Sequence, residues 1–160
     1  NLKASKVYRA SKEDFVIYDE VKMEIEAQYQ RFVELTGQKP HYFEGHAVHS
    51  FTFAKALEDV AKEHGCDFLG FPMGKPVKFR NTDIYCSMDS MMPNYDPFES
   101  LKKACVKDYG EGICMFVCHP GYLDAYILSV SSLTIPRTLE VEMLTSNQIK
   151  QWLKLTIQFQ

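Results

Sequence analysis

Two short apolar runs that each end in a histidine are the feature that most constrains how this chain can fold. The first lies in the stretch Tyr42 to His49 (YFEGHAVH) and the second in Met115 to Tyr122 (MFVCHPGY). In each stretch, residues that stop a strand follow the apolar run directly, which is how an α/β protein places reactive groups at one mouth of its sheet. We therefore expect His46 and His119 at strand ends, with the rest of the chain as the scaffold that brings these ends together.

The spacing of apolar residues predicts helices and strands that take turns along the chain. Apolar side chains recur every three or four positions from Tyr18 to Thr36, which predicts an amphipathic helix that ends before Gly37. Further helices are predicted after Ser50, over Phe98 to Val106 and after Ser146, and strands over 42–44, 66–71, 113–118 and 155–159. This alternation indicates the α/β class with a largely parallel sheet.

Two segments carry more specific structural expectations. Residues 113–118 have no polar interruption, so we expect a strand that is covered on both faces. Residues 72–97 hold four of the seven prolines and show no clear period, which predicts a long loop. Loops of that length are commonly functional lids or disordered segments, and the sequence leaves both readings open.

Length and composition bound the class of protein. The 160 residues predict a single domain over 1–160, with a polar, flexible lead-in at residues 1–12, and the start at Asn1 rather than Met indicates a fragment. A net charge of -3 argues against nucleic-acid binding. Without a membrane-length apolar run or a signal peptide, we expect a cytoplasmic protein with no membrane partner. The five cysteines include no Cys-x-x-Cys pair, which favours reduced thiols.

His46 and His119 are the candidate reactive residues. Histidine is the usual ligand of catalytic zinc and related ions, and its imidazole is the side chain best matched to proton transfer near neutral pH. The alternative for each is a hydrogen-bonded structural histidine. His49 would be a second metal ligand only if its segment turned helically, and we expect His41 and His64 to be surface residues.

Three charged residues could assist these histidines. Glu44 is two positions before His46, so in extended geometry both point to the same face and Glu44 could orient the imidazole; the alternative is a solvated acid. Asp124 could fix the tautomer of His119 or contact substrate, although loop aspartates usually cap turns. Arg137 could bind a substrate oxygen or pair with an acid at the surface. The chain has no Gly-rich phosphate loop, no Gly-x-Ser-x-Gly elbow and no metal-spaced cysteine set.

Several segments together resemble one known family, the YdjC-like carbohydrate deacetylases, which include the chitooligosaccharide deacetylases. The resemblance runs from about Tyr18 to the C-terminus, with its motifs in the family's order and spacing. They are Glu26 to Gly37, Lys39-Pro40, Glu44 to His46, Cys118 to Asp124, Pro136-Arg137 and Glu140 to Ser146.

This resemblance implies a fold, a reaction and roles for site residues. The fold is a distorted (β/α) barrel, and the reaction removes the acetyl group of an N-acetylated sugar or oligosaccharide with a divalent metal, magnesium or zinc. By resemblance, His46 matches a metal-binding histidine and His119 matches the histidine of a His-Pro motif, where the general acid for the leaving amine is expected. Arg137 matches a recurrent arginine with an expected structural or substrate-orienting role.

The chain also departs from the family pattern. Glu44 stands where the family usually has aspartate, and Ala47 where a further histidine is common. The family's N-terminal Asp-Asp-Phe-Gly and Gly-x-His stretches, which supply the base and the other metal ligands, do not occur in this sequence. We therefore expect a C-terminal portion that lacks the first strands of the barrel and is inactive alone, with exposed sheet edges that favour pairing into a homo-oligomer.

Two other hypotheses stay open beside the deacetylase. One is a non-enzymatic half-barrel that self-associates or binds sugar through aromatic side chains such as Tyr42, Phe43, Phe71 and Tyr122. The other is a metal hydrolase that acts on a different amide or ester. Metal analysis separates the deacetylase from the first alternative, and a substrate panel separates it from the second.

Overall fold

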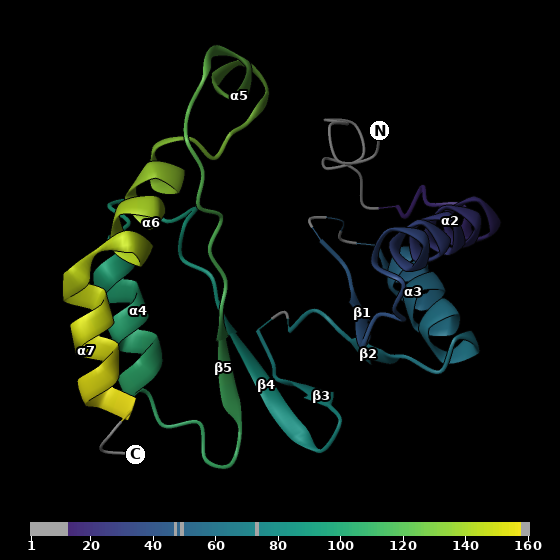
Figure 1. Ribbon diagram of the computed structural model, residues 1–160, viewed down its shortest axis with the longest axis horizontal. Coiled ribbons are helices and arrows are strands. Elements are labelled where there is room, and N and C mark those ends of the chain that lie inside the picture. Colours follow the sequence, from purple (N-terminus) through teal and green to yellow (C-terminus); the bar gives the residue numbers. More distant parts are fainter. Residues whose placement is uncertain (1–12, 47, 49, 73, 158–160) are drawn as a thin grey trace. The chain divides into compact units, whose positions relative to one another are not determined.

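The computed structural model describes residues 13–46, 48, 50–72 and 74–157 (Figure 1). The chain divides into two compact units, Asn1–Asp83 and Ile84–Gln160. The expected flexible lead-in at 1–12 lies outside the described residues, as do Ala47 and His49. That residues 1–160 form a single domain stays a prediction.

Helix α2, Tyr18–Thr36, is the first helix of the described residues and has the predicted bounds. It ends because Gly37 adopts a left-handed conformation (φ +66°) and its N–H donates to the Val33 carbonyl at 2.8 Å. Ile25 is buried on the face that packs against helix α3, Phe51–Glu63. The local signals of periodicity and a C-terminal glycine were therefore sufficient to place this helix.

Strand β1, Tyr42–Glu44, and strand β2, Asp67–Leu69, form a parallel pair connected through α3. The predicted cap of α3 is confirmed, because the Ser50 hydroxyl accepts a hydrogen bond from the Phe53 N–H at 2.9 Å. Apolar side chains of α2 and α3 build the core of this unit, with Phe43 and Phe68 of the strands packed against it; its buried members are Ile25, Ala56, Leu57 and Val60.

The segment 72–97 is not a loop throughout, so that prediction is wrong for the nine residues of two strands and for Pro97, which begins helix α4, Pro97–Val106. It contains strand β3, Val77–Phe79, and strand β4, Thr82–Ser87, separated by Arg80, which has a positive φ of 55°, and Asn81. All four prolines of the segment fall outside the two strands, so their number did not argue against strands between them. β4 begins in the first unit and continues into the second.

In the second unit, β4 pairs in parallel with strand β5, Ile113–Phe116, through helix α4, Pro97–Val106. Asp96 caps α4 by accepting from the Phe98 and Glu99 N–H groups at 2.9 and 3.0 Å. The expectation that both faces of β5 are covered is wrong. Ile113 is 58% exposed and the other residues of β5 are half-buried; among the described residues β5 pairs with β4 alone.

Three helices follow β5: α5, Ala125–Val130, α6, Ile135–Thr145, and α7, Asn147–Ile157. Figure 1 shows α6 and α7 beside α4, and the core of this unit forms there around Leu101, Met143 and Ile149. Helix α6 was not predicted. The expected strand at 155–159 is wrong for residues 155–157, which continue α7, because the helical spacing of Ile149 and Trp152 outweighs a short alternation at the end of the chain.

The described structure is therefore a mixed α/β fold with two parallel strand pairs, as the α/β prediction requires, while the barrel stays a prediction. All five cysteines lie among the described residues and are free thiols, as predicted. Within the described ranges, no helix is both long and apolar enough to span a bilayer.

Candidate active site

His46 follows β1 by two residues, and its side chain is exposed. The intervening Gly45 is required by close packing: a Cβ at this position would lie 3.0 Å from Phe53 Cε1 and 3.3 Å from Leu57 Cδ1. The main chain at Gly45 therefore lies against α3, directly before His46. The predicted placement of this histidine just beyond a strand end is confirmed.

Glu44 is the last residue of β1 and is exposed. It borders an open hollow of about 210 Å³ that is lined mostly by aromatic and aliphatic side chains, among them Tyr29, Phe32 and Tyr42. Because β1 ends at Glu44, the two-residue strand period does not extend to His46. That Glu44 orients the His46 imidazole stays a prediction.

The residues described around His46 do not form a complete metal site. Nowhere in the described ranges do three or more His, Cys, Asp or Glu side chains come together in a group that could hold a metal ion. A catalytic zinc site uses about three protein ligands. His46 alone therefore does not fit a complete site.

His119 lies just beyond β5, as predicted, and its main chain is bonded on both sides. Pairing with β4 continues to Val117, whose N–H donates to the Ser87 carbonyl at 2.9 Å. The His119 N–H donates to Glu140 Oε2 at 2.5 Å, and its carbonyl accepts from Arg137 Nη1 at 3.3 Å. The half-buried His119 therefore lies in a segment, residues 117–124, that follows β5 and is bonded through its main chain to helix α6. We call this segment the His119 turn.

Arg137, the third residue of α6, contacts the His119 turn. Its Nε donates to the Leu133 carbonyl at 2.9 Å, and its own carbonyl accepts from the Gly121 N–H at 3.3 Å. These partners are main-chain groups rather than the acidic side chain of a surface ion pair. They support the structural part of the expected role, and contact with substrate stays a prediction.

Asp124 caps helix α5. Its Oδ1 accepts from the Ile127 N–H at 2.7 Å, and its side chain is exposed. This is the turn-capping role that loop aspartates commonly have. That Asp124 also fixes the tautomer of His119 or contacts substrate stays a prediction.

Glu140 is a site residue to which sequence reasoning gave no role. It is 0% exposed, and besides the His119 N–H it accepts the hydroxyl of Tyr95 on Oε1 at 3.0 Å. Burial and the hydrogen bond to this carboxylate raise the pKa of Tyr95, and burial together with its charge raises the pKa of the Cys118 thiol. A helix predicted from Pro136 would have found it, since Glu140 and buried Met143 are three positions apart on one face.

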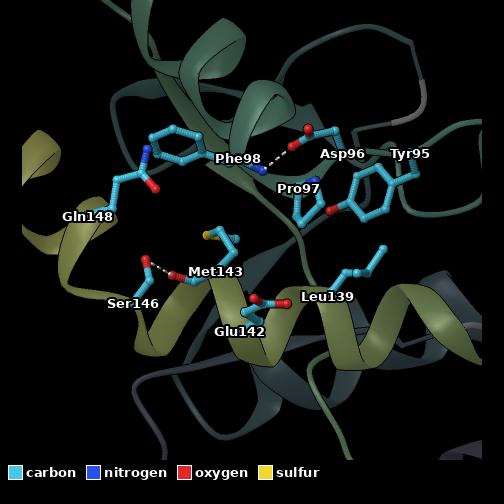
Figure 2. A pocket seen from close by; sticks show the side chains of 9 residues that line it. All are labelled: Tyr95, Asp96, Pro97, Phe98, Leu139, Glu142, Met143, Ser146 and Gln148. Atoms are coloured by element: carbon cyan, nitrogen blue, oxygen red, sulfur yellow. Dashed lines mark hydrogen bonds between the residues drawn. The ribbon is translucent and has the colours of Figure 1, made fainter.

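Tyr95 also borders an open hollow of about 290 Å³ between the start of α4 and helices α6 and α7, shown in Figure 2. Two polar residues that line the hollow form hydrogen bonds with main-chain groups at the ends of the surrounding helices. Asp96 caps α4, and the Ser146 hydroxyl donates to the Met143 carbonyl at 2.9 Å while accepting from the Ile149 N–H at 3.1 Å. The hollow therefore lies where these helices meet, and its residue Tyr95 is connected to the His119 turn through Glu140.

The fold places the chain in a structural class. A crystal structure of an Enterococcus faecalis V583 protein assigned to cellobiose-phosphate cleavage is similar over 88% of this chain and 58% of its own length, with a TM-score of 0.60 and 20% sequence identity. This similarity shows a shared mixed α/β fold.

The sequence then identifies the family. The pattern of the YdjC-like protein family matches residues 3–155, so the chain belongs to that family and the resemblance drawn from its motifs is confirmed. Carbohydrate deacetylase 2 of Listeria innocua serovar 6a is 30% identical over 148 residues, which cover 84% of this chain and 55% of the relative. Chitooligosaccharide deacetylase of Salmonella newport is 26% identical over 153 residues, or 90% of this chain and 60% of the relative. The chain thus spans little more than half the length of these relatives.

Proposed function

We propose that the whole protein hydrolyses the N-acetyl group of an N-acetylated sugar or chitooligosaccharide. The names of the relatives support this reaction class. The observation in this chain that carries the proposal is the His119 turn, in which a half-buried histidine follows a parallel strand and is held through its main chain by helix α6.

The chemistry of amide hydrolysis assigns a task to His119. The attacking water gives up one proton to a base as its oxygen bonds to the acetyl carbon. The bond from that carbon to the sugar nitrogen then breaks, and the nitrogen leaves as an amine only if it gains a proton from an acid. Imidazole is the side chain suited to donate that proton near neutral pH. In this proposal His119 is the general acid, Arg137 maintains the turn that carries it, and Asp124 ends the same loop at helix α5.

Metal dependence belongs to the proposal for the whole protein. A divalent ion, magnesium or zinc, would supply an activated water and polarise the amide carbonyl, with His46 as one ligand and Glu44 beside it. Because the described residues offer no complete ligand group, we propose that the 160-residue polypeptide is inactive by itself. Cytoplasmic location and pairing through sheet edges likewise stay predictions.

The test uses the protein encoded by the complete reading frame and measures acetate release from N-acetylglucosamine oligomers. We expect His119→Ala to lower kcat by about 100- to 10,000-fold, the usual contribution of a general acid. His41→Ala is the control, because it removes an exposed imidazole that has no role in the proposal and should retain activity. We also expect His46→Ala to lose a stoichiometric metal ion. Full activity of the His119 variant would overturn the assignment.

A second candidate is sugar binding without catalysis, and the hollow beside β1 favours it. Its exposed aromatic side chains Phe32 and Tyr42 could stack on sugar rings, with Gln28 and Glu44 available for hydroxyl groups. Calorimetric titration with the same oligomers in the presence of a chelator decides between the candidates. Sugar binding that survives the chelator, without acetate release by the metal-loaded protein, would favour the binding module.

A further inference from the structure

Glu140 is a buried carboxylate with one donor for each oxygen. The Tyr95 hydroxyl donates to Oε1 at 3.0 Å and the His119 N–H donates to Oε2 at 2.5 Å. Removing a carboxylate from water is costly unless hydrogen bonds compensate it, and bonds to a charged group are shorter and stronger than neutral ones. Both bonds therefore compensate a carboxylate that is 0% exposed in the interior of the second unit.

Helix α6 contacts the His119 turn at a second place, three residues before Glu140. Arg137 donates to the His119 carbonyl at 3.3 Å and accepts from the Gly121 N–H at 3.3 Å. Both main-chain groups of His119 are therefore bonded to one helix, and Pro120, which has a fixed φ, separates it from Gly121. With both peptide groups held, the direction in which the His119 side chain leaves the main chain is set.

We propose that Glu140 is a positioning residue that, with Arg137 and Tyr95, fixes the His119 main chain so that the imidazole meets the leaving nitrogen of the substrate. This inference rests on the proposed role of His119 as the general acid. Orientation matters because a displacement of about 1 Å in a reacting group can lower a rate by about 100-fold. Tyr95 directly precedes the cap of α4, so the same carboxylate also connects that end of α4 to the turn.

The alternative is that Glu140 only stabilises the fold, and conservative variants separate the two roles. In Glu140→Gln the amide oxygen can still accept from the His119 N–H while the amide nitrogen donates to the Tyr95 oxygen, so the arrangement survives without the charge. Glu140→Ala removes both bonds. Glu142→Ala is the matched control, because Glu142 is an exposed acid two residues further along the same helix.

In the whole protein we expect Glu140→Ala to lower kcat by about 10- to 100-fold with little change in KM, since the substrate still binds but the acid is misplaced. Glu140→Gln should recover most of kcat, and Glu142→Ala should match the unchanged protein. If Glu140→Ala does not fold, Glu140→Asp replaces it, because the shorter side chain cannot reach both donors. A folded Ala or Asp variant with unchanged kcat would overturn the proposal.

Amide hydrogen exchange at residues 119 and 121 provides a readout that needs no activity. We expect exchange to become at least 10-fold faster at these two amides in Glu140→Ala, and to stay slow in Glu140→Gln and Glu142→Ala. If exchange is faster in Glu140→Ala but the unchanged whole protein releases no acetate, Glu140 fixes the His119 turn and the proposed function is rejected. Unchanged exchange in Glu140→Ala would reject the positioning role whether or not the protein is an enzyme.

Discussion

Tyr95→Phe isolates one hydrogen bond in the interior of the second unit. The substitution keeps the ring and removes the hydroxyl that donates to Glu140 Oε1 at 3.0 Å, which leaves a fully buried carboxylate with one donor fewer. Hydrogen bonds to charged groups contribute about 1.5 to 3 kcal/mol. Because Tyr95 itself is half-buried, we expect the free energy of unfolding to fall by the lower part of that range, about 1.5 to 2 kcal/mol.

The pH dependence of that loss has a defined sign. Burial and the bond to Glu140 raise the pKa of Tyr95 in the folded state above the ordinary value of 10.0. The folded protein therefore holds this proton more tightly than the unfolded chain, so the stabilisation is complete below pH 10 and is lost as the pH rises toward the folded-state pKa. A single group contributes a slope of at most about 1.4 kcal/mol per pH unit, and Tyr95→Phe removes this slope.

Urea unfolding followed by tryptophan fluorescence is the assay, because Trp152 is the only tryptophan and packs in the core of the second unit. The control is Tyr126→Phe, which removes a hydroxyl from a ring that is 69% exposed. We expect Tyr95→Phe to be less stable than the control at pH 8, with the difference shrinking at pH 10.5. Equal stability of the two variants at pH 8 would refute the reasoning.

Three further predictions concern packing and capping. Val60→Ala removes two methyl groups from a side chain that is 0% exposed, so we expect a loss of about 2 kcal/mol in urea unfolding followed by circular dichroism. Gly45→Ala places a Cβ 3.0 Å from Phe53 Cε1 and should cost about 1 to 3 kcal/mol in the same assay; full stability would show that the ring moves aside freely. Asp96→Ala removes the cap of α4 and should lower stability by about 1 kcal/mol by tryptophan fluorescence, whereas Asp96→Asn should retain most of it.

Elements with local signals could be predicted from the sequence. Gly37 ends α2, Ser50 caps α3, and Asp96 with Pro97 begins α4, each within a few residues of the expected bound. The placement of His119 beyond a parallel strand followed from an apolar run and a Pro-Gly stop. These features depend on near neighbours in the chain, which is why one sequence suffices to find them.

Features set by distant partners could not be predicted. The helical spacing of Glu140 and Met143 indicates that Glu140 lies on the buried face of α6, but it does not reveal the donors, Tyr95, 45 residues earlier, and His119, 21 residues earlier. The proline content of segment 72–97 does not predict strands β3 and β4, because all four prolines lie outside these two strands. The end of α7 was missed because packing of Ile149 and Trp152, rather than the alternation at residues 155–157, decides its conformation.

Glu140 and Arg137 both hold the segment around His119 through its peptide groups. Glu140 accepts from the main-chain N–H, and Arg137 donates to the main-chain carbonyl. These two bonds therefore do not depend on which side chain residue 119 carries. For the proposed deacetylase, one codon could thus change the chemistry at residue 119 while these main-chain bonds persist. Variants of His119 would then test the proposed sugar binding separately from acetate release.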